Sequence, residues 1–149
     1  MKENIYRILG LDVGSKTIGI AVSDVLHLTA QGVGTIQRKS LKKDFQALSH
    51  VIDRYQIGEI VVGLPRNMNN SLGEQAEEIL NFIARLKKYF KLPVRTWDER
   101  LTTIAADRVL EEAEVHPKKR KKVVDKIAAA LILQGYLDFK KMGKLDPAN

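Results

Sequence analysis

The sequence predicts a single α/β domain built on a mixed β-sheet. Residues 8–38 alternate apolar and polar positions in three short runs, which is typical of antiparallel strands. Residues 59–65 form an apolar run with little alternation, as in a strand buried on both faces, and Pro93 opens a further strand at 94–98. Helical periodicity separates these later strands, and such a connection predicts a right-handed crossover to a parallel neighbour. A chain of 149 residues is long enough for one such domain with a real core.

The first two strands are expected to form a hairpin over residues 8–24, with Gly14-Ser15-Lys16 as its turn. Asp12 interrupts the apolar pattern, because it stands where a buried strand favours valine or isoleucine. An unpaired carboxylate there costs several kcal/mol or is forced to protonate. We therefore expect a cation to face Asp12. Residues 28–38 form a weaker third strand that pairs back onto the second.

Two amphipathic helices are expected between the later strands. Apolar residues recur at spacings of three or four from Leu41 to Tyr55, with Asp44 on the polar side, and Ile57-Gly58 ends this helix. Ser71 and Glu74 fit a capping box at the start of the next helix. That helix is expected to turn five residues inward: Ala76, Ile79, Leu80, Ile83 and Leu86.

The last third of the chain is expected to hold two more helices. One begins at a cap formed by Thr102 or Thr103, and the final one runs from about Lys121 to Lys140. Trp97 lies inside a strand, so we expect it in the core rather than as a platform for nucleic-acid bases. We place the domain at residues 1–141 and a C-terminal tail at 142–149.

Composition narrows the function further. The sequence has no cysteine, which excludes disulfides, thiol nucleophiles and thiolate zinc sites, and its three histidines lack metal-ligand spacing. It has no apolar run long enough to cross a membrane and no signal segment, so a soluble cytoplasmic protein is expected. The net charge of +7 favours polyanions as partners, nucleic acid first among them.

Carboxylates stand at three places where structure alone does not require them. Asp12 ends the first strand, Asp98-Glu99 ends the last one, and Asp125 projects from an apolar helix face toward the sheet. If these ends meet, the carboxylates repel one another unless a divalent cation lies between them, and oxygen ligands select Mg²⁺ or Mn²⁺. Two such ions can activate a water and stabilise the leaving oxygen of a phosphodiester. Purely structural roles stay open, since Asp12 could cap the turn and Asp98 the next helix.

Basic and polar residues frame this acidic group. The longest cationic run, Lys118-Lys119-Arg120-Lys121-Lys122, comes shortly before Asp125 and suits a phosphate backbone, although such runs also form ordinary solvated surfaces. Further candidate contacts to phosphate or sugar lie in the hairpin turn, in the loop after residue 65 and beside Glu99: Ser15, Lys16, Arg66, Asn67, Asn69 and Arg100. No element for direct base readout is evident, so recognition of nucleic-acid shape is expected.

Four segments together resemble one known family. They are Gly10-Leu-Asp-Val-Gly-Ser-Lys-Thr-Ile-Gly-Ile-Ala-Val-Ser-Asp24, Val62-Gly-Leu-Pro-Arg-Asn67 with its loop through Gly73, Asp98-Glu-Arg-Leu-Thr-Thr103, and Lys121-Lys-Val-Val-Asp-Lys-Ile-Ala-Ala-Ala130. They are similar to the YqgF family, also called RuvX, which is known as a Holliday junction resolvase and now usually described as the nuclease that matures the 5′ end of the 16S ribosomal RNA precursor. The similarity covers essentially the whole chain, with the motifs in the family's order.

The resemblance implies a ribonuclease H-like fold: a five-stranded mixed sheet, three antiparallel strands followed by two parallel ones, with helices on both faces. It also implies that Asp12, Glu99 and Asp125 are the catalytic, metal-binding acids, with Asp98 as the other possible ligand at the strand end. The implied substrate is a ribosomal RNA precursor or branched DNA, cut by a monomer or a homodimer.

Two other classes of function stay open. The first hairpin alone also resembles the phosphate-binding turn of actin-like ATPases, but those proteins need a second phosphate loop that is absent from this sequence. A non-catalytic nucleic-acid binding factor, in which the basic run supplies the affinity, is the remaining alternative.

Overall fold

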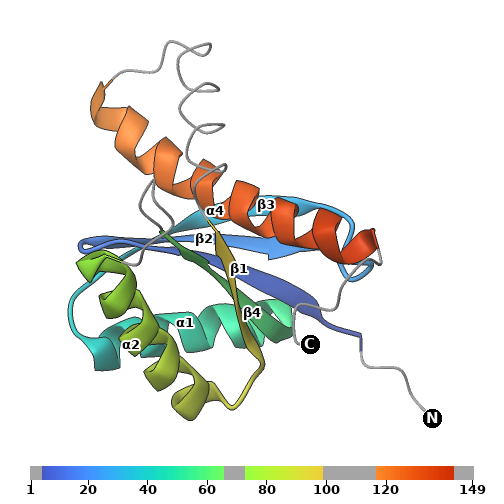
Figure 1. The fold of residues 1–149 in the computed structure, drawn as a ribbon, viewed down its shortest axis with the longest axis horizontal. Helices are drawn as coiled ribbons and strands as arrows, with labels where there is room; N and C mark the ends of the chain where they lie inside the picture. Colours follow the sequence, from blue (N-terminus) through green and yellow to red (C-terminus); the bar gives the residue numbers. More distant parts are fainter. Residues whose placement is uncertain (1–4, 66–72, 99–116, 143–149) are drawn as a thin grey trace.

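The computed structural model describes residues 5–65, 73–98 and 117–142, with the backbone alone for 117–125. Within these ranges the chain forms one five-stranded sheet in the order β3-β2-β1-β4-β5 (Figure 1). The strands are β1 (Arg7–Val13), β2 (Thr17–Ser23), β3 (Ala30–Gln37), β4 (Ile57–Leu64) and β5 (Val94–Asp98). β1, β2 and β3 pair antiparallel, whereas β4 pairs parallel with both β1 and β5. The predicted α/β class and mixed sheet are confirmed.

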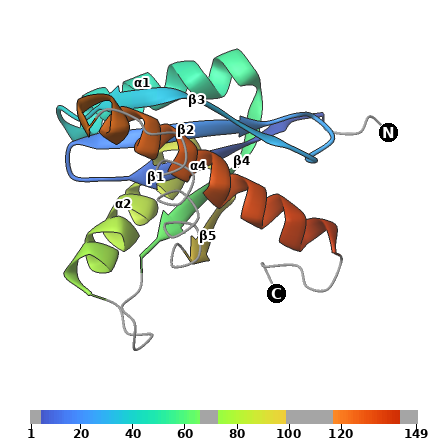
Figure 2. The same ribbon diagram turned by 90° about the horizontal axis from the view of Figure 1, so that it is seen from above.

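Helices cover both faces of the sheet. Helices α1 (Leu41–Tyr55) and α2 (Glu74–Phe90) lie on one face, and α4 (Pro117–Lys141) crosses the other obliquely (Figures 1 and 2). Each face has its own apolar core, because alternate strand residues point in opposite directions. Leu9, Leu11 and Val13 of β1 pack with the α1 and α2 side, whereas Ile8 packs with α4.

The boundaries of the first two helices differ from the predicted ones. Helix α1 is capped by the Ser40 side chain, and Gln56 ends it in the left-handed conformation, so β4 already begins at Ile57. Helix α2 begins at Glu74 after Gly73, which makes no side-chain cap, so the predicted capping box does not start this helix. Leu80 is 37% exposed, contrary to prediction, and Phe82 is buried in its place.

Helix α4 begins at Pro117, four residues before the predicted start. Proline suits the first turn of a helix, where its missing N–H would have no partner. The helix packs very closely on the sheet, because a Cβ atom on Gly10 of β1 would lie 2.7 Å from Leu133 Cβ, and one on Gly32 of β3 would lie 2.6 Å from Lys126 Cγ. Glycine at these two strand positions therefore sets the distance between α4 and the sheet.

The C-terminal half of α4 is fixed by a buried polar group. Glu59 of β4 is 5% exposed and accepts hydrogen bonds from the Tyr136 hydroxyl and from Lys140 Nζ. Arg95 Nε of β5 lies 3.9 Å from the same carboxylate. Trp97 packs edge-on against Tyr136 and Phe139, which confirms the core role predicted for it. No helix in the described ranges is both long and apolar enough to cross a membrane.

Candidate active site

Asp12 lies at the carboxyl end of the central strands. β1, β4 and β5 run parallel, so their carboxyl ends meet at one edge of the sheet. Leu11 pairs with Val62, which places Asp12 level with Gly63, and Gly63 pairs with Trp97 of β5. Ligands of open α/β sheets bind at such an edge. The carboxylate that interrupts the apolar pattern thus occupies a position suited to a site.

Three of the strand positions around Asp12 on its own face of the sheet are glycines. Asp12 pairs directly with Gly19 of β2 and stands level with Gly63 of β4, and Gly10 precedes it on the same face of β1. All three glycines are buried, and Gly10 lies directly beneath Leu133 of α4, so these three neighbours of Asp12 add no side chain of their own beside its carboxylate. Asp12 is partly exposed and has at least one polar partner in the structure.

Asp12 faces the layer that holds α4. Alternation along β1 places Asp12 on the same side as Ile8 and Gly10, both of which pack with this helix. Lys126 packs over Gly32, which is level with Gly10, and Gln134 bonds to Ala30, which is level with Ile8. From Gln134 toward its N-terminus, α4 therefore approaches the end of β1 where Asp12 lies.

Asp125 lies in this N-terminal part of α4. Its backbone lies in the helix one turn before Ala129, whose carbonyl oxygen would be 3.2 Å from a Cβ atom on Gly10. Ala128, Ala129 and Ile132 are buried, as the sequence predicts for the face that includes position 125. The topology thus brings the backbone of position 125 to the side of the sheet that Asp12 faces, whereas the Asp125 side chain is outside the described part.

Asp98 lies on the opposite side of the sheet from Asp12. It pairs with Leu64, which belongs to the core under α1 and α2, whereas Trp97 packs with α4. Alternation therefore directs Asp98 away from the side that Asp12 faces. Glu99, the other predicted acid of this strand end, lies outside the described residues.

The donor set suits a hard divalent ion. Aspartate and glutamate oxygens are the ligands that Mg²⁺ and Mn²⁺ prefer, and Asp12, which is partly exposed, offers such a donor. Within the described residues no group of three acidic or histidine side chains is found, and only Asp12 of the three predicted acids has its side chain there. A complete set depends on Glu99 and Asp125.

The turn after Asp12 presents Ser15 and Lys16 to solvent, as a phosphate contact requires. Arg38 holds this turn: its Nη1 donates to the Gly14 carbonyl at 2.8 Å, and its backbone N–H donates to the Lys16 carbonyl at 2.8 Å. Its Nε also pairs with Asp44 at 3.2 Å.

Asp44 is 2% exposed, so its predicted place on the polar side of α1 is wrong. This role of Arg38 was not predicted from the sequence. The sequence does carry a signal for it, because Arg38 shortly precedes α1 and Asp44 lies in the first turn of that helix.

A cavity of about 320 Å³ opens beneath this turn. Val13, Gly14, Ser15 and Arg38 line one side, and α2 supplies the other side with Gln75, Glu78, Ile79 and Phe82. Val13 packs with the α1 and α2 layer, so the cavity is on the opposite side of the sheet from the face of Asp12. The cavity therefore adjoins the turn but is not part of the site that Asp12 faces.

The other predicted contacts to nucleic acid are mostly outside the described part. This holds for Arg66, Asn67, Asn69 and Arg100. Lys118, Lys119, Arg120 and Lys121 are described by backbone alone, in the first two turns of α4. The N-terminal end of α4 is directed toward the sheet edge at which β1 ends, so the start of this helix is the end nearer to the candidate site (Figure 1).

Comparison with known proteins agrees with this geometry. A family model described as RuvX, Holliday junction resolvase, matches residues 6–139. A protein of Thermoanaerobacter pseudethanolicus named "Putative pre-16S rRNA nuclease" is 54% identical over 136 residues, covering 91% of this chain and 98% of that relative. A protein of Clostridium novyi with the same name is 54% identical over 132 residues, covering 89% of this chain and 98% of its own.

Two solved structures that share the fold are Holliday junction resolvases. Thermus thermophilus RuvC, in complex with a Holliday junction substrate, aligns with a TM-score of 0.61 at 16% identity, covering 95% of this chain and 99% of that one. The fowlpox virus Holliday junction resolvase aligns with a TM-score of 0.55 at 15% identity, covering 90% of this chain and 99% of that one. At these identities the likeness concerns the fold alone, and it agrees with the ribonuclease H-like fold expected from the sequence.

Proposed function

This chain belongs to the RuvX family, and from that premise we propose that it is a divalent-metal-dependent endonuclease that processes the 5′ end of the 16S ribosomal RNA precursor. The observation that carries the proposal is the position of Asp12: a carboxylate at the carboxyl end of the central strand, among glycines, facing α4. The name shared by relatives at 54% identity supports the RNA substrate. Such processing would take place in the cytoplasm.

Asp12, Glu99 and Asp125 are the proposed catalytic acids and would hold Mg²⁺ or Mn²⁺ through their oxygens. The ions would supply a nucleophilic water at neutral pH and charge stabilisation at the leaving oxygen. Glu99 is preferred to Asp98 because alternation directs Asp98 to the far face of the sheet. Gly19 and Gly63 beside Asp12 would place no side chain between its carboxylate and a substrate phosphate.

Two basic groups would position the substrate. Ser15 and Lys16, on the turn that Arg38 holds, would contact phosphate beside Asp12. Lys118, Lys119, Arg120 and Lys121 would contact it from the start of α4, with Arg66, Asn67, Asn69 and Arg100 completing the set. Neutralising Lys118 to Lys121 should weaken nucleic-acid binding and reduce its dependence on salt concentration. An unchanged salt dependence would show that these residues are ordinary solvent-exposed cations that do not contact the substrate.

Resolution of four-way DNA junctions is the second candidate, favoured by the fold shared with RuvC. Paired cuts on two strands call for a symmetric homodimer, whereas trimming one RNA end needs only a monomer. The solution mass of the protein alone and with each substrate therefore bears on the choice between RNA and DNA.

A cleavage assay tests the proposal. Purified protein is incubated with labelled 16S ribosomal RNA precursor and with a four-way DNA junction, each with Mg²⁺, Mn²⁺ or a chelator. We expect metal-dependent cleavage of the RNA, loss of cleavage in Asp12→Asn, and normal cleavage in Asp53→Asn, a matched change at an exposed position of α1. Binding without metal-dependent cleavage of either substrate would leave the chain as a non-catalytic binding factor.

A further inference from the structure

An open apolar groove lies between α1 and α2, on the layer away from Asp12. Its volume is about 570 Å³, and six residues line it: Leu41, Lys42, Phe45, Arg85, Lys88 and Tyr89. The candidate active site uses none of these residues. The groove combines an aromatic floor with a cationic rim, and this combination limits what can bind there.

Tyr89 supplies the exposed part of the floor. It is 53% exposed, and its ring is supported by Phe45 at 5.1 Å and by Phe90 at 4.7 Å between ring centroids. Phe45 itself is only 3% exposed and also packs against Phe82. A ring fixed by other rings keeps its orientation, so Tyr89 offers a flat apolar surface at low entropic cost.

The rim is cationic. Lys42 comes from the first turn of α1, and Arg85 and Lys88 come from α2. Among the described lining residues there is no acid, and within the described part of the chain these three cations form no ion pair. Lys42 and Lys43 also stand near the positive end of the α1 dipole, where cations are disfavoured. The rim therefore attracts an anionic occupant.

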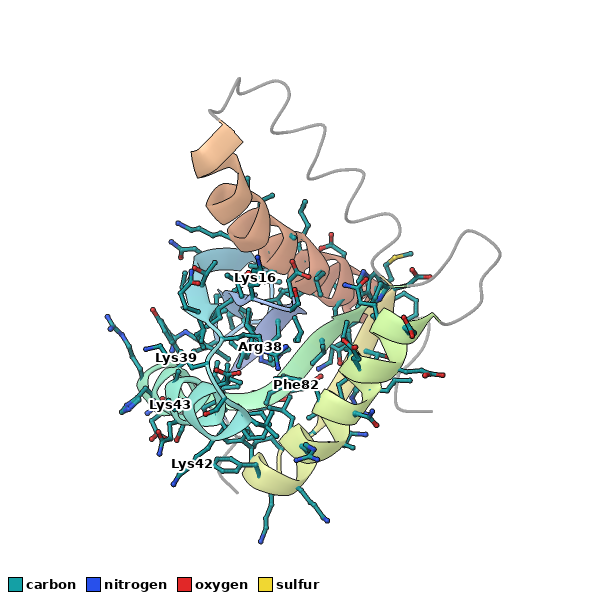
Figure 3. All side chains as sticks on the ribbon, turned by 90° about the vertical axis from the view of Figure 1, so that its left-hand side faces the viewer. Lys16, Arg38, Lys39, Lys42, Lys43 and Phe82 are labelled. Atoms are coloured by element: carbon teal, nitrogen blue, oxygen red, sulfur yellow. The ribbon has the colours of Figure 1, made fainter. Side chains whose placement is uncertain are left out.

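A line of exposed lysines joins this groove to the turn beside Asp12. Lys16 lies in that turn, and its carbonyl is bonded to the backbone of Arg38, which precedes Lys39. Lys39 and Lys43 then lead to Lys42 at the groove, and Figure 3 shows these cations following one another over one side of the molecule. Glu78 of α2 lines the smaller cavity together with Ser15 and Arg38.

We propose that the α1–α2 groove binds an unpaired nucleotide segment of the nucleic-acid substrate, with a base on Tyr89 and phosphates on Lys42, Arg85 and Lys88. The lysine track would carry the backbone from the turn beside Asp12 to this groove. Single strands are bound in this manner, because cations follow the backbone while any base can stack on an aromatic ring. This inference rests on the proposed nuclease function and names the form of substrate that reaches its site.

A binding experiment without metal separates this proposal from catalysis. Fluorescence anisotropy is measured with a labelled single-stranded RNA of about 20 nucleotides, long enough for one binding track, in chelator and over a range of salt. Tyr89→Ala should weaken binding about tenfold, and Tyr89→Phe should restore it, because stacking needs the ring and not the hydroxyl.

The charge test has a matched control on the same helix. Lys88→Glu should weaken binding and lower the salt slope, whereas Lys87→Glu, an adjacent exposed position outside the groove, should change both much less. RNA containing 5-iodouridine should crosslink to the peptide that contains Tyr89. In cleavage assays, Tyr89→Ala should slow cleavage of RNA with an unpaired segment more than cleavage of a fully paired arm.

The outcomes separate the two proposals. If wild-type protein neither cleaves nor binds any nucleic acid, the proposed function itself fails. If wild-type protein cleaves but Tyr89→Ala and Lys88→Glu bind like their controls, the groove proposal alone is overturned. It is also overturned if Tyr89→Ala changes only the solution mass, because the groove would then join two copies of the chain, or if an acidic peptide binds there and the RNA does not.

Discussion

Arg38 Nη1 donates a hydrogen bond to the carbonyl oxygen of Gly14, 2.8 Å away, and so ties the end of β3 to the turn that follows Asp12. The same guanidinium pairs with the buried Asp44 and lies 5.3 Å over the Phe82 ring. One side chain thus connects the turn, the start of α1 and the middle of α2.

Replacing Arg38 should disturb both stability and substrate binding. Arg38→Ala leaves the Asp44 carboxylate buried without its ion pair, so we expect a loss of about 1–3 kcal/mol in the free energy of unfolding, measured with denaturant. Arg38→Lys should recover little, because an ammonium lacks the planar fork that reaches two acceptors at once. Recovery of stability in Arg38→Ala with Asp44→Asn would confirm the pair, and a fully stable Arg38→Ala would contradict it.

Gly10→Ala should push α4 away from the sheet. The added Cβ would lie 2.7 Å from Leu133 Cβ and 3.2 Å from the Ala129 carbonyl, neither of which is the end of a flexible side chain. We expect a cost of about 1–3 kcal/mol from overpacking, together with reduced cleavage because α4 also carries Asp125. Gln37→Ala, at an exposed strand position, is the control. Wild-type stability in Gly10→Ala would show that the helix tolerates a shift.

Tyr136→Phe should weaken the attachment of α4 to β4. Burial, together with the Glu59 carboxylate that accepts its hydrogen bond, raises the pKa of Tyr136 well above its usual range, so the phenol stays protonated as a donor. Its loss should cost about 1–3 kcal/mol, since the buried carboxylate loses one donor. A double-mutant cycle with Glu59→Gln measures the coupling, and additive effects of the two changes would refute it.

Asp24 should make stability depend on pH in the acid range. Hydrogen bonds from the backbone N–H groups of Thr29, Leu28 and Leu26 hold the pKa of this carboxyl below its usual value. A lowered pKa in the folded state adds stability above the unfolded pKa, and this is lost as pH falls through the folded value. Asp24→Asn should thus be less stable than wild type at neutral pH, and the difference in Tm should shrink below about pH 4.

Much of the fold could be predicted because it follows from local hydrophobic patterns that do not depend on contacts between distant residues. Alternation in residues 8–24 predicted both the hairpin and the unusual position of Asp12, and Gly14-Ser15-Lys16 between the two apolar runs marked the turn. Boundaries were less predictable. Gln56 adopts a left-handed conformation that glycine or asparagine favours, and Gly73 begins α2 without a side-chain cap, so neither end carries its usual signal.

The parts of the candidate site that rest on one unusual residue could be predicted from the sequence. The parts that rest on contacts between residues far apart in the sequence could not. Asp12 stood out because a carboxylate is costly in a strand. The burial of Asp44 was missed because its partner, Arg38, lies on another element, and tertiary pairing overrides the helical pattern. The glycines opposite Asp12 acquire meaning only through strand register. Glu99 and Asp125 as ligands stay predictions.

The pairing of β2 with β3 shifts between Ile20 and Ala21, because Gly34 and Gly32 are their partners and Val33 is passed over. Such a bulge increases twist at the edge of a sheet and disfavours the addition of another strand. β3 is an edge strand, so the bulge protects this side of the sheet from edge-to-edge aggregation. A two-fold assembly that continues the sheet through β3 is therefore disfavoured, whereas β5, the strand at the opposite edge, pairs with β4 without a register shift.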